Sequence, residues 1–531
     1  MSPEPPDPPD PPTPPDPPDP PNLPDPFGEA GVVETHISTL VFVGDRAYKF
    51  KKPVTFGFLD FSTPQLRRVA CHNEVVLNRR LAPDVYLGVA EHLDEHGRPD
   101  YAVVMRRMDP RRRLGSLVIA GAAEVDDRLV ELAGVVAGFH RRAERSAAID
   151  ADATAEAVRR EWDAGTDEMA EFVGPVLDPV VFDAVVRRYR QFLDGRTALF
   201  DARIDAGYVC DGHGDLQAED VFCTPDGPQV LDCIEFDSHL RHCDVLADVA
   251  FMAMDLERLG DRPAGDRFVA SWASALGGSA LGGSALGGSA VHPALLHHYI
   301  AERAFVRAKV ACLRHGQQSP GSPEAIGTAA AARDLLAMCA AHLEAAAPRL
   351  VVVGGSPGTG KTTVAVGLGQ ATGWPVLHSD VVRKQRLGLD PASRPSADDY
   401  RRLYEPSEVA ATYTDVLTAA ADHLAMGRSV VLDASWTSAA ERDRARKVAN
   451  EARADVIELQ CVCDLHEARR RVADRLGVAG PSGAAGASDA TAEVADLLAS
   501  RTDAWPEATQ LDTEDTPALV VRAAVAEVGP W

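Results

Sequence analysis

The alternation of hydrophobic and polar positions divides the chain into a strand-rich start, a long helical stretch and a second series of strands and helices. Leu40 to Val43 and Arg46 to Lys52 flank Gly44-Asp45, which predicts a β-hairpin with a two-residue turn. Helical spacing dominates from about Asp126 to Leu199. A short strand-rich stretch, Tyr208 to Phe236, follows before helices resume.

A second series of strands and helices begins after Pro348. Leu350 to Val353 is a continuous apolar strand, followed by a glycine-rich loop and a helix that begins at Lys361. Further apolar strands are predicted at 375–377, 430–432 and 455–462, with helices between them. Strands that alternate with helices indicate a parallel sheet covered on both faces.

These patterns predict an α+β bilobal, protein-kinase-like domain followed by an α/β P-loop NTPase domain with a parallel sheet. We expect residues 1–26 to form a disordered tail, because this Pro-Pro-Asp repeat has little to bury and few backbone donors. The kinase-like domain is then 27–345, and the P-loop domain is 346–531. A Ser-Ala-Leu-Gly-Gly repeat at 275–290 is predicted to be a flexible loop inside the first domain.

Composition narrows the class of protein. At 531 residues, 45% hydrophobic and 25% charged, the chain has the make-up of a globular protein with several domains. The formal net charge of −25 makes a long nucleic acid an unlikely partner. No apolar run is long enough for a membrane helix and no secretory signal is visible, so the predicted compartment is the cytoplasm.

The octet that begins at Gly355 matches the Walker A pattern G-x-x-x-x-G-K-[ST] at every fixed position and lies between a strand and a helix. Its backbone N–H groups are expected to wrap the phosphates of ATP, with Lys361 on the β and γ phosphates and the Thr362 hydroxyl on Mg²⁺. The predicted nucleotide contacts are Gly355, Ser356, Pro357, Gly358, Thr359, Gly360, Lys361, Thr362 and Thr363.

Three further residues belong to this predicted site. Asp433 ends the strand 430–432, where an acid can hold magnesium or merely cap a turn. Around Ser379-Asp380 the sequence resembles the small P-loop kinases that include gluconate kinases, zeta-toxin-like kinases and polynucleotide 5′-kinases. The resemblance implies that Asp380 contacts the acceptor hydroxyl as general base and that Arg383 binds substrate; an N-capping role for Asp380 is the alternative.

Arg471 and Arg475 lie one helical turn apart. In the kinases that this half resembles, such a helix leads into a lid whose arginines stabilise the transferring phosphate, and the Gly/Ala/Ser-rich segment 477–487 suits a lid. A solvated basic helix face is the alternative.

A second set of phosphate-handling residues precedes the P-loop half. His213-Gly214-Asp215-Leu216 resembles the H-G-D-x-x-x-x-N loop of aminoglycoside phosphotransferase-like kinases. The resemblance implies that Asp215 is the catalytic base and that position 220 binds magnesium. Asp220 stands where the family has Asn, so turnover at this centre is in doubt.

The same resemblance assigns a second magnesium carboxylate about twenty residues later. Glu235 and Asp237 would face one way if the strand continued through them, and Asp232 is the alternative. On the hairpin, Lys49 resembles the lysine that contacts ATP, with Lys51 as its rival, and Glu74 stands where the family keeps the lysine's partner.

These features predict a bifunctional, ATP- and Mg²⁺-dependent kinase that transfers phosphate to the alcohol group of small hydroxylated substrates. The alternative is a nucleotide-binding regulator with a degenerate first kinase domain and a P-loop ATPase half. The expected partner is a small phosphoryl acceptor, with neither a membrane nor a long nucleic acid. A proline-recognising protein could bind the tail.

Overall fold

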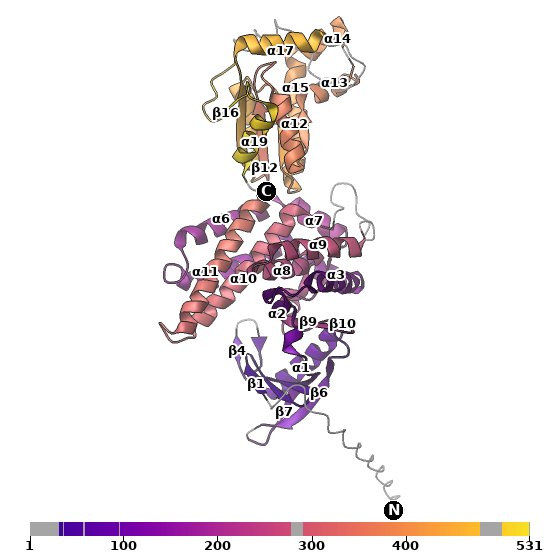
Figure 1. Ribbon diagram of the computed structural model, residues 1–531, viewed down its shortest axis with the longest axis vertical. Coiled ribbons are helices and arrows are strands. Elements are labelled where there is room, and N and C mark those ends of the chain that lie inside the picture. Colours follow the sequence, from indigo (N-terminus) through magenta and orange to yellow (C-terminus); the bar gives the residue numbers. More distant parts are fainter. Residues whose placement is uncertain are drawn as a thin grey trace, which may run out of the picture. The chain divides into compact units, whose positions relative to one another are not determined.

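A computed structural model describes residues 31–35, 37–56, 59–94, 96–277, 290–393, 395–477 and 502–529 (Figure 1). The chain divides into two compact units, residues 1–75 with 84–109 and residues 76–83 with 110–531. The predicted tail 1–26, most of the loop 275–290 and the lid 478–487 lie outside the described residues. No helix in the described ranges is long and apolar enough to cross a membrane.

The first unit is built on a five-stranded antiparallel sheet in the order β1-β2-β3-β7-β6. The predicted hairpin is confirmed: Val43 pairs with Arg46, and Gly44 adopts the positive φ of 54° that this tight turn requires. The elements that begin in this unit are β1 (Gly31–Glu34), β2 (Ser38–Val43), β3 (Arg46–Lys51), β4 (Thr55–Phe56), β5 (Leu59–Asp60), α1 (Pro64–Asn78), β6 (Tyr86–Leu93) and β7 (Pro99–Arg106).

The second unit begins with a helical body. Its core is formed by apolar faces of α3, α5, α6, α8, α9, α10 and α11. The predicted helices between Asp126 and Leu199 are present. The elements are η1 (Pro110–Arg112), α2 (Leu114–Ile119), α3 (Val125–Arg142), α4 (Ala147–Asp152), α5 (Ala155–Met169), η2 (Ala170–Phe172), α6 (Pro179–Gly195), α7 (Thr197–Asp205), α8 (Val245–Arg258), α9 (Arg262–Leu276), α10 (Pro293–Gly316) and α11 (Pro323–Ala346).

Short strands and turns interrupt these helices where the sequence predicts a strand-rich stretch. β9 pairs with β10, and β11 pairs with β8, both antiparallel. β10 ends at Val230, so the expected continuation of a strand through Glu235 and Asp237 is wrong. The elements are β8 (Val209–Asp211), η3 (Ala218–Asp220), β9 (Val221–Thr224), β10 (Gly227–Val230), η4 (His239–Arg241) and β11 (His242–Asp244).

The last part of the second unit is a five-stranded parallel sheet in the order β13-β14-β12-β15-β16. Alternate residues of β12 face opposite cores: Leu350 and Val352 pack with α15 and α16, and Val351 and Val353 pack with α12 and α19. The elements are β12 (Arg349–Gly354), α12 (Lys361–Thr372), β13 (Val376–His378), α13 (Ser379–Arg386), α14 (Ala397–Leu403), α15 (Pro406–Ala425), β14 (Val430–Asp433), α16 (Ala439–Glu451), β15 (Asp455–Val462), α17 (Leu465–Gly477), β16 (Thr509–Asp512) and α19 (Pro517–Val528).

The fold class predicted from the sequence is confirmed in these elements: an α+β first part precedes an α/β P-loop domain with a parallel sheet (Figure 1). The predicted boundary at 345–346 falls inside the second unit, where α11 ends shortly before β12 begins. Arg196, which is fully buried, donates hydrogen bonds there to the carbonyls of Leu424, Ala452 and Arg453.

Candidate functional site

The Walker A residues form a curled loop between β12 and α12. Gly358 and Gly360 have φ angles of 89° and 82°, which side chains other than glycine rarely adopt. A Cβ on Gly358 would lie 2.3 Å from the carbonyl oxygen of Ala468, so this position also requires glycine on steric grounds. Because the loop ends at the first turn of α12, several N–H groups there have no partner within the helix and can bind phosphate oxygens.

The loop is fastened on two sides. The Gly355 amide donates to the carbonyl of Ser435, and the Thr513 hydroxyl lies 2.7 Å from the carbonyl oxygen of Thr359. Arg471 in turn donates to the Thr513 carbonyl and to Glu467. Arg471 therefore contacts Thr513, the residue whose hydroxyl supports the loop. The side chain of Arg475 lies outside the described residues, so the lid assignment stays a prediction.

Asp433 stands at the carboxyl end of β14, next to the loop. Its Oδ2 accepts a hydrogen bond from Nδ1 of His378 at 2.7 Å, and its Oδ1 is buried without a hydrogen-bond partner in the described part of the chain. A buried carboxylate oxygen without a donor is costly unless a cation or water satisfies it. Asp433 thus fits the predicted role of a magnesium ligand.

Lys361 and Asp433 lie in the same region of the domain. Burial raises the pKa of the Cys461 thiol to about 12. The positive charge of Lys361 acts to lower this pKa, and the negative charge of Asp433 acts to raise it. A pocket of about 170 Å³ adjoins the loop and is mostly apolar. It is lined by Gly355, Ser356, Thr359, Ser435, Trp436, Gln460, Cys461, Val462, Cys463, Leu465, Ala468, Thr502 and Trp505.

Asp380 lies in the first turn of α13 and is not its N-cap, because the helix begins at Ser379 with His378 as the capping position. Its carboxylate accepts a hydrogen bond from Arg383 at 2.9 Å, and the Arg383 guanidinium stacks over the ring of Tyr404. The negative charge of Asp380 also helps to raise the pKa of His378, after the larger effect of the hydrogen bond to Asp433. The predicted base, substrate arginine and metal acid are therefore neighbours.

In the first unit, Glu74 is fully buried and pairs with both candidate lysines. Lys49 lies 2.9 Å from one carboxylate oxygen, and Lys51 lies 2.7 Å from the other. The ammonium of Lys51 also lies over the ring of Phe61. The predicted lysine–glutamate pair is thus present, and Lys49 and Lys51 remain equal candidates for contacting a nucleotide.

The His-Gly-Asp loop of the second unit is braced by Asp248. Both oxygens of this buried carboxylate accept backbone hydrogen bonds, from His213 at 2.7 Å and from Gly214 at 2.8 Å. His140 donates a third hydrogen bond, and these contacts hold the pKa of Asp248 below its ordinary range although burial alone would raise it. Asp248 therefore acts as the structural acid that fixes the loop.

Asp215 projects from this rigid loop and accepts a hydrogen bond from Gln217 at 2.7 Å. Burial raises the pKa of Asp215 to about 6. The positive charges of Arg307 and Arg303 oppose this rise, and the negative charge of Asp232 adds to it. A carboxylate with a pKa near the working pH is well suited to accept a proton from a hydroxyl.

The negative charge of Asp232 is among the charges that raise the pKa of Asp215, after the larger effect of burial. The Leu231 amide donates to the carbonyl of Asp220, which places Asp232 and Asp220 on adjoining turns. Asp232 is exposed and has a φ of 65°, whereas Glu235 is buried. Asp237 accepts a hydrogen bond from the His239 amide at 2.9 Å and so belongs to the next turn. Glu235 and Asp237, with Asp232 as the alternative, therefore stay predicted magnesium ligands.

Sequence reasoning missed His378, Thr513 and the cluster of Asp152, His239 and His242. His378 could have been found, because it ends a strand directly before Asp380, at the edge where a parallel sheet gathers its functional groups. The other contacts join distant segments and have no local signal.

Comparisons with known proteins give one family match and several similar solved structures. Residues 350–503 match the model of a family described as an AAA domain. Among solved structures, a putative kinase from Chloroflexus aurantiacus is 20% identical with a TM-score of 0.28, and covers 34% of this chain and 98% of its own. An aminoglycoside phosphotransferase solved with GDP and kanamycin is 15% identical with a TM-score of 0.38, and covers 60% and 95%.

Curated relatives extend over both halves. The uncharacterized protein Rv2004c of Mycobacterium tuberculosis (strain H37Rv) is 38% identical over 484 residues, which is 91% of this chain and 92% of that protein. The uncharacterized protein Mb2027c of Mycobacterium bovis matches with the same identity and coverage. At this identity over nearly the whole length of both proteins, the chain belongs to the same family as these mycobacterial proteins.

Proposed function

We propose that this protein is an ATP-dependent phosphotransferase whose P-loop half phosphorylates the hydroxyl group of a small molecule. The observation that carries the proposal is the curled loop 355–362, whose glycines sit in positive-φ conformations at the first turn of α12. This loop lies in one region with an acid, Asp433, that has an unpartnered buried oxygen. Main-chain amides that bind phosphate beside such an acid are recurring features of sites that transfer phosphoryl groups.

The proposed reaction uses this chain's residues in distinct roles. The acceptor oxygen forms a bond to the γ-phosphorus of ATP, the bond from that phosphorus to the β–γ bridging oxygen breaks, and ADP leaves. Asp380 takes the proton of the acceptor hydroxyl, while Lys361 and Arg471 balance the charge on the phosphates. Thr362 and Asp433 offer the oxygen ligands that Mg²⁺ requires, and this ion supplies further charge neutralisation when bound.

The first half supplies a second proposed centre, with Asp215 as the base. Its proposed metal ligands are Asp220 with Glu235 and Asp237, and Asp232 is the alternative to that pair. The pair formed by Glu74 with Lys49 and Lys51 would serve the nucleotide phosphates in the first unit. The acceptor is again a small hydroxylated molecule. The proposed location of the protein is the cytoplasm.

The main test is binding of Mg-ATP to the full-length protein and its Lys361→Ala variant by isothermal titration. Loss of one charged hydrogen-bonding group is expected to weaken binding at the P-loop about 10- to 100-fold. Lys447→Ala is the matched control, because Lys447 is an exposed lysine on α16 of the same domain. Equal ATP affinity in all three proteins would contradict the proposal.

A regulatory role for the first half is the second candidate, and Asp220 is the observation that favours it. An extra negative charge at the metal-binding position opposes the charge balance that phosphoryl transfer requires, so a centre with Asp220 could bind ATP without turning it over. ATP consumption by Asp220→Asn, measured in a Lys361→Ala background with a sugar and aminoglycoside panel, separates the two. A marked gain indicates a disabled centre, and no gain leaves the first half as an ordinary kinase or as inactive for other reasons.

A further inference from the structure

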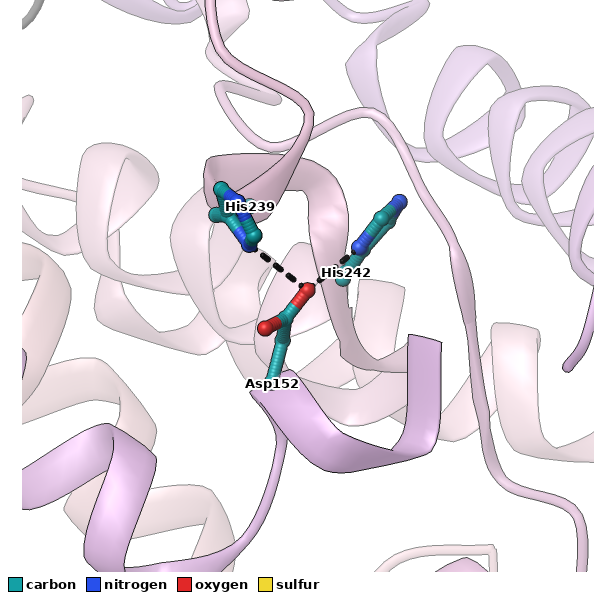
Figure 2. Close-up of side chains that lie close together, drawn as sticks. All are labelled: Asp152, His239 and His242. Carbon is teal, nitrogen blue, oxygen red and sulfur yellow. Dashed lines mark hydrogen bonds and ion pairs between the residues drawn. The ribbon is translucent and has the colours of Figure 1, made fainter. Parts of the chain in front are cut away.

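Asp152, His239 and His242 form a compact cluster in the second unit, outside both proposed phosphotransfer centres. Nδ1 of His239 lies 2.8 Å from Oδ2 of Asp152, and Nδ1 of His242 lies 2.6 Å from the same oxygen. One candidate donor atom from each residue lies within 4.8 Å of the others. Figure 2 shows the two rings approaching Asp152 from opposite sides, while its other oxygen points away from them.

Three separate elements position these side chains. Asp152 ends α4, whose first turn is capped by Ser146, and His239 begins the turn η4. His242 begins β11, and its backbone pairs with Asp211 of β8. Two residues further on, Asp244 makes a buried double hydrogen bond to Arg203. The donor atoms are therefore held together by the surrounding fold, as a preformed metal site requires.

The charge around the cluster favours a cation. Asp237 accepts a hydrogen bond from the His239 amide, and its negative charge acts on the His239 ring. The negative charges of Asp152 and Asp237 both act on Glu161 of α5. Burial raises the pKa of Glu161 to about 7, so the negative charge beside the two imidazoles comes chiefly from Asp152 and Asp237.

The site is also accessible. The His239 side chain is 68% exposed, whereas those of His242 and Asp152 are 15% and 21% exposed. An ion can therefore enter from solvent on the His239 side and meet two better-buried ligands.

We propose that Asp152, His239 and His242 bind a divalent transition metal ion, for which Zn²⁺ is the probe. Two imidazole nitrogens and one carboxylate oxygen form a borderline donor set that suits Zn²⁺, whereas Mg²⁺ prefers oxygen ligands alone. Zn²⁺ binds such nitrogen and oxygen atoms at roughly 2.0 to 2.2 Å. Donor atoms that now share hydrogen bonds need only small movements to surround it. Three protein ligands leave a fourth position for water or another small ligand.

A bound ion would join α4 to the segment that carries Asp232, Glu235 and Asp237. The proposal does not depend on the phosphotransferase activity, because its ligands are separate from Asp215 and from the P-loop.

The test is equilibrium dialysis of full-length, chelator-treated protein against Zn²⁺ with excess Mg²⁺, followed by metal analysis. The wild type is compared with His239→Ala, His242→Ala and Asp152→Ala. Each variant is expected to lose one bound equivalent of Zn²⁺. Removal of an outer-shell partner costs about 10- to 100-fold in metal affinity, and removal of a direct ligand should cost more than that. His466→Ala, an exposed histidine of the P-loop half, is the control and should keep wild-type binding.

Co²⁺ provides a second readout that cysteines cannot imitate. The nine cysteines are free thiols, and sulfur ligation to Co²⁺ would add a charge-transfer band in the near ultraviolet. The proposed site predicts visible ligand-field bands without that band, and these bands should disappear in His239→Ala. Thermal unfolding serves to check that His239→Ala is folded. We expect it to fold because the His239 side chain is largely exposed. Zn²⁺ stoichiometry and Co²⁺ spectra that are the same in wild type and in a folded His239→Ala protein would overturn the proposal.

Discussion

Nδ1 of His378 lies 2.7 Å from Oδ2 of Asp433, and the two residues stand opposite each other in the neighbouring parallel strands β13 and β14. This hydrogen bond occupies one carboxylate oxygen and fixes the orientation of the other. The remaining oxygen is the buried atom that has no donor in the described ranges. His378 therefore positions Asp433 in the way that outer-shell partners orient metal ligands.

We predict that His378→Ala lowers the affinity of the P-loop site for magnesium without abolishing ATP binding. Loss of an outer-shell hydrogen bond to a metal ligand typically costs about 10- to 100-fold in metal affinity. The Mg²⁺ concentration for half-maximal ATP turnover should rise by that factor. His423→Ala, a change on α15 of the same domain, should leave it at the wild-type value, and an equal shift in both variants would refute the role of His378.

A single methyl group at Gly358 should destroy nucleotide binding. Its Cβ would lie 2.3 Å from the Ala468 carbonyl oxygen, and its φ of 89° is strained for alanine. Gly358→Ala is expected to lose ATP binding at the P-loop by calorimetry, which leaves only binding at the first half, while the protein stays folded by circular dichroism.

Gly373→Ala separates backbone strain from steric blockage. Gly373 has a similar φ of 74° but nothing within 4 Å of its added Cβ. This control should cost about 1 to 2 kcal/mol of stability and leave ATP affinity unchanged.

The activity of the first half should rise with pH through about 6. Burial raises the pKa of Asp215 to about 6, and the residue accepts a proton only when it is deprotonated. In a Lys361→Ala background, kcat/KM for an identified acceptor should fall tenfold per pH unit below that value and level off above it. Asp215→Asn should remove the activity at every pH. If kcat/KM did not change with pH in the protein that keeps Asp215, Asp215 would not be the base.

Three histidines at the start of α10, His292 at its N-cap and His297 and His298 in its first turns, should make stability fall as the solution is acidified. Burial lowers the pKa of His298 to about 3, and it lowers that of His292 and His297 to about 4. An unfolded histidine has a pKa near 6.5, so the stabilisation is complete above that pH. It is lost as pH falls toward the folded values, at about 1.4 kcal/mol per pH unit for each histidine. Denaturant titrations at pH 7.5 and 5.5 measure this loss.

His298→Phe should flatten that dependence. Neither ring nitrogen of His298 has a hydrogen-bond partner in the described part of the chain, and the ring stacks on Phe192 with centroids 4.3 Å apart. Phenylalanine keeps the stacking and removes two unsatisfied polar atoms, so stability at pH 7.5 should rise by about 1 kcal/mol. His140→Phe, which loses the hydrogen bond to Asp248, should instead destabilise the protein.

Arg196 should join the helical body to the P-loop domain. Its guanidinium donates to carbonyls at the carboxyl ends of α15 and α16, where the helix dipoles favour a positive charge. Burial lowers its pKa to about 10, but it stays protonated at neutral pH. Arg196→Met leaves buried carbonyls unpaired and should cost at least about 3 kcal/mol, seen as separate unfolding transitions of the two parts.

Arg188→Ala is the matched control for this joint. Arg188 also bridges the two parts, through Glu344 and Asp455, but its partners are more than a third exposed. Its loss should change the free energy of unfolding by less than about 1 kcal/mol. A single unchanged transition in Arg196→Met would show that Arg196 does not couple the parts.

Features written in consecutive residues could be predicted from the sequence. The hairpin at 40–52, the strand at 455–462 and the P-loop follow from hydrophobic periodicity, turn chemistry and glycine spacing, which act over a few residues. The position of Asp433 at the end of a strand was predicted in the same way, and a parallel strand presents its last residue at the binding edge of the sheet.

Relationships between distant segments were decided only by the tertiary structure. The strand β10 ends at Val230, so the alternation that would place Glu235 and Asp237 on one face of a strand does not extend to them. Asp152 reaches His239 across more than eighty residues. Sequence patterns report forces along the backbone, whereas such contacts depend on how helices and strands pack, and that packing sets both the burial and the charges of each site.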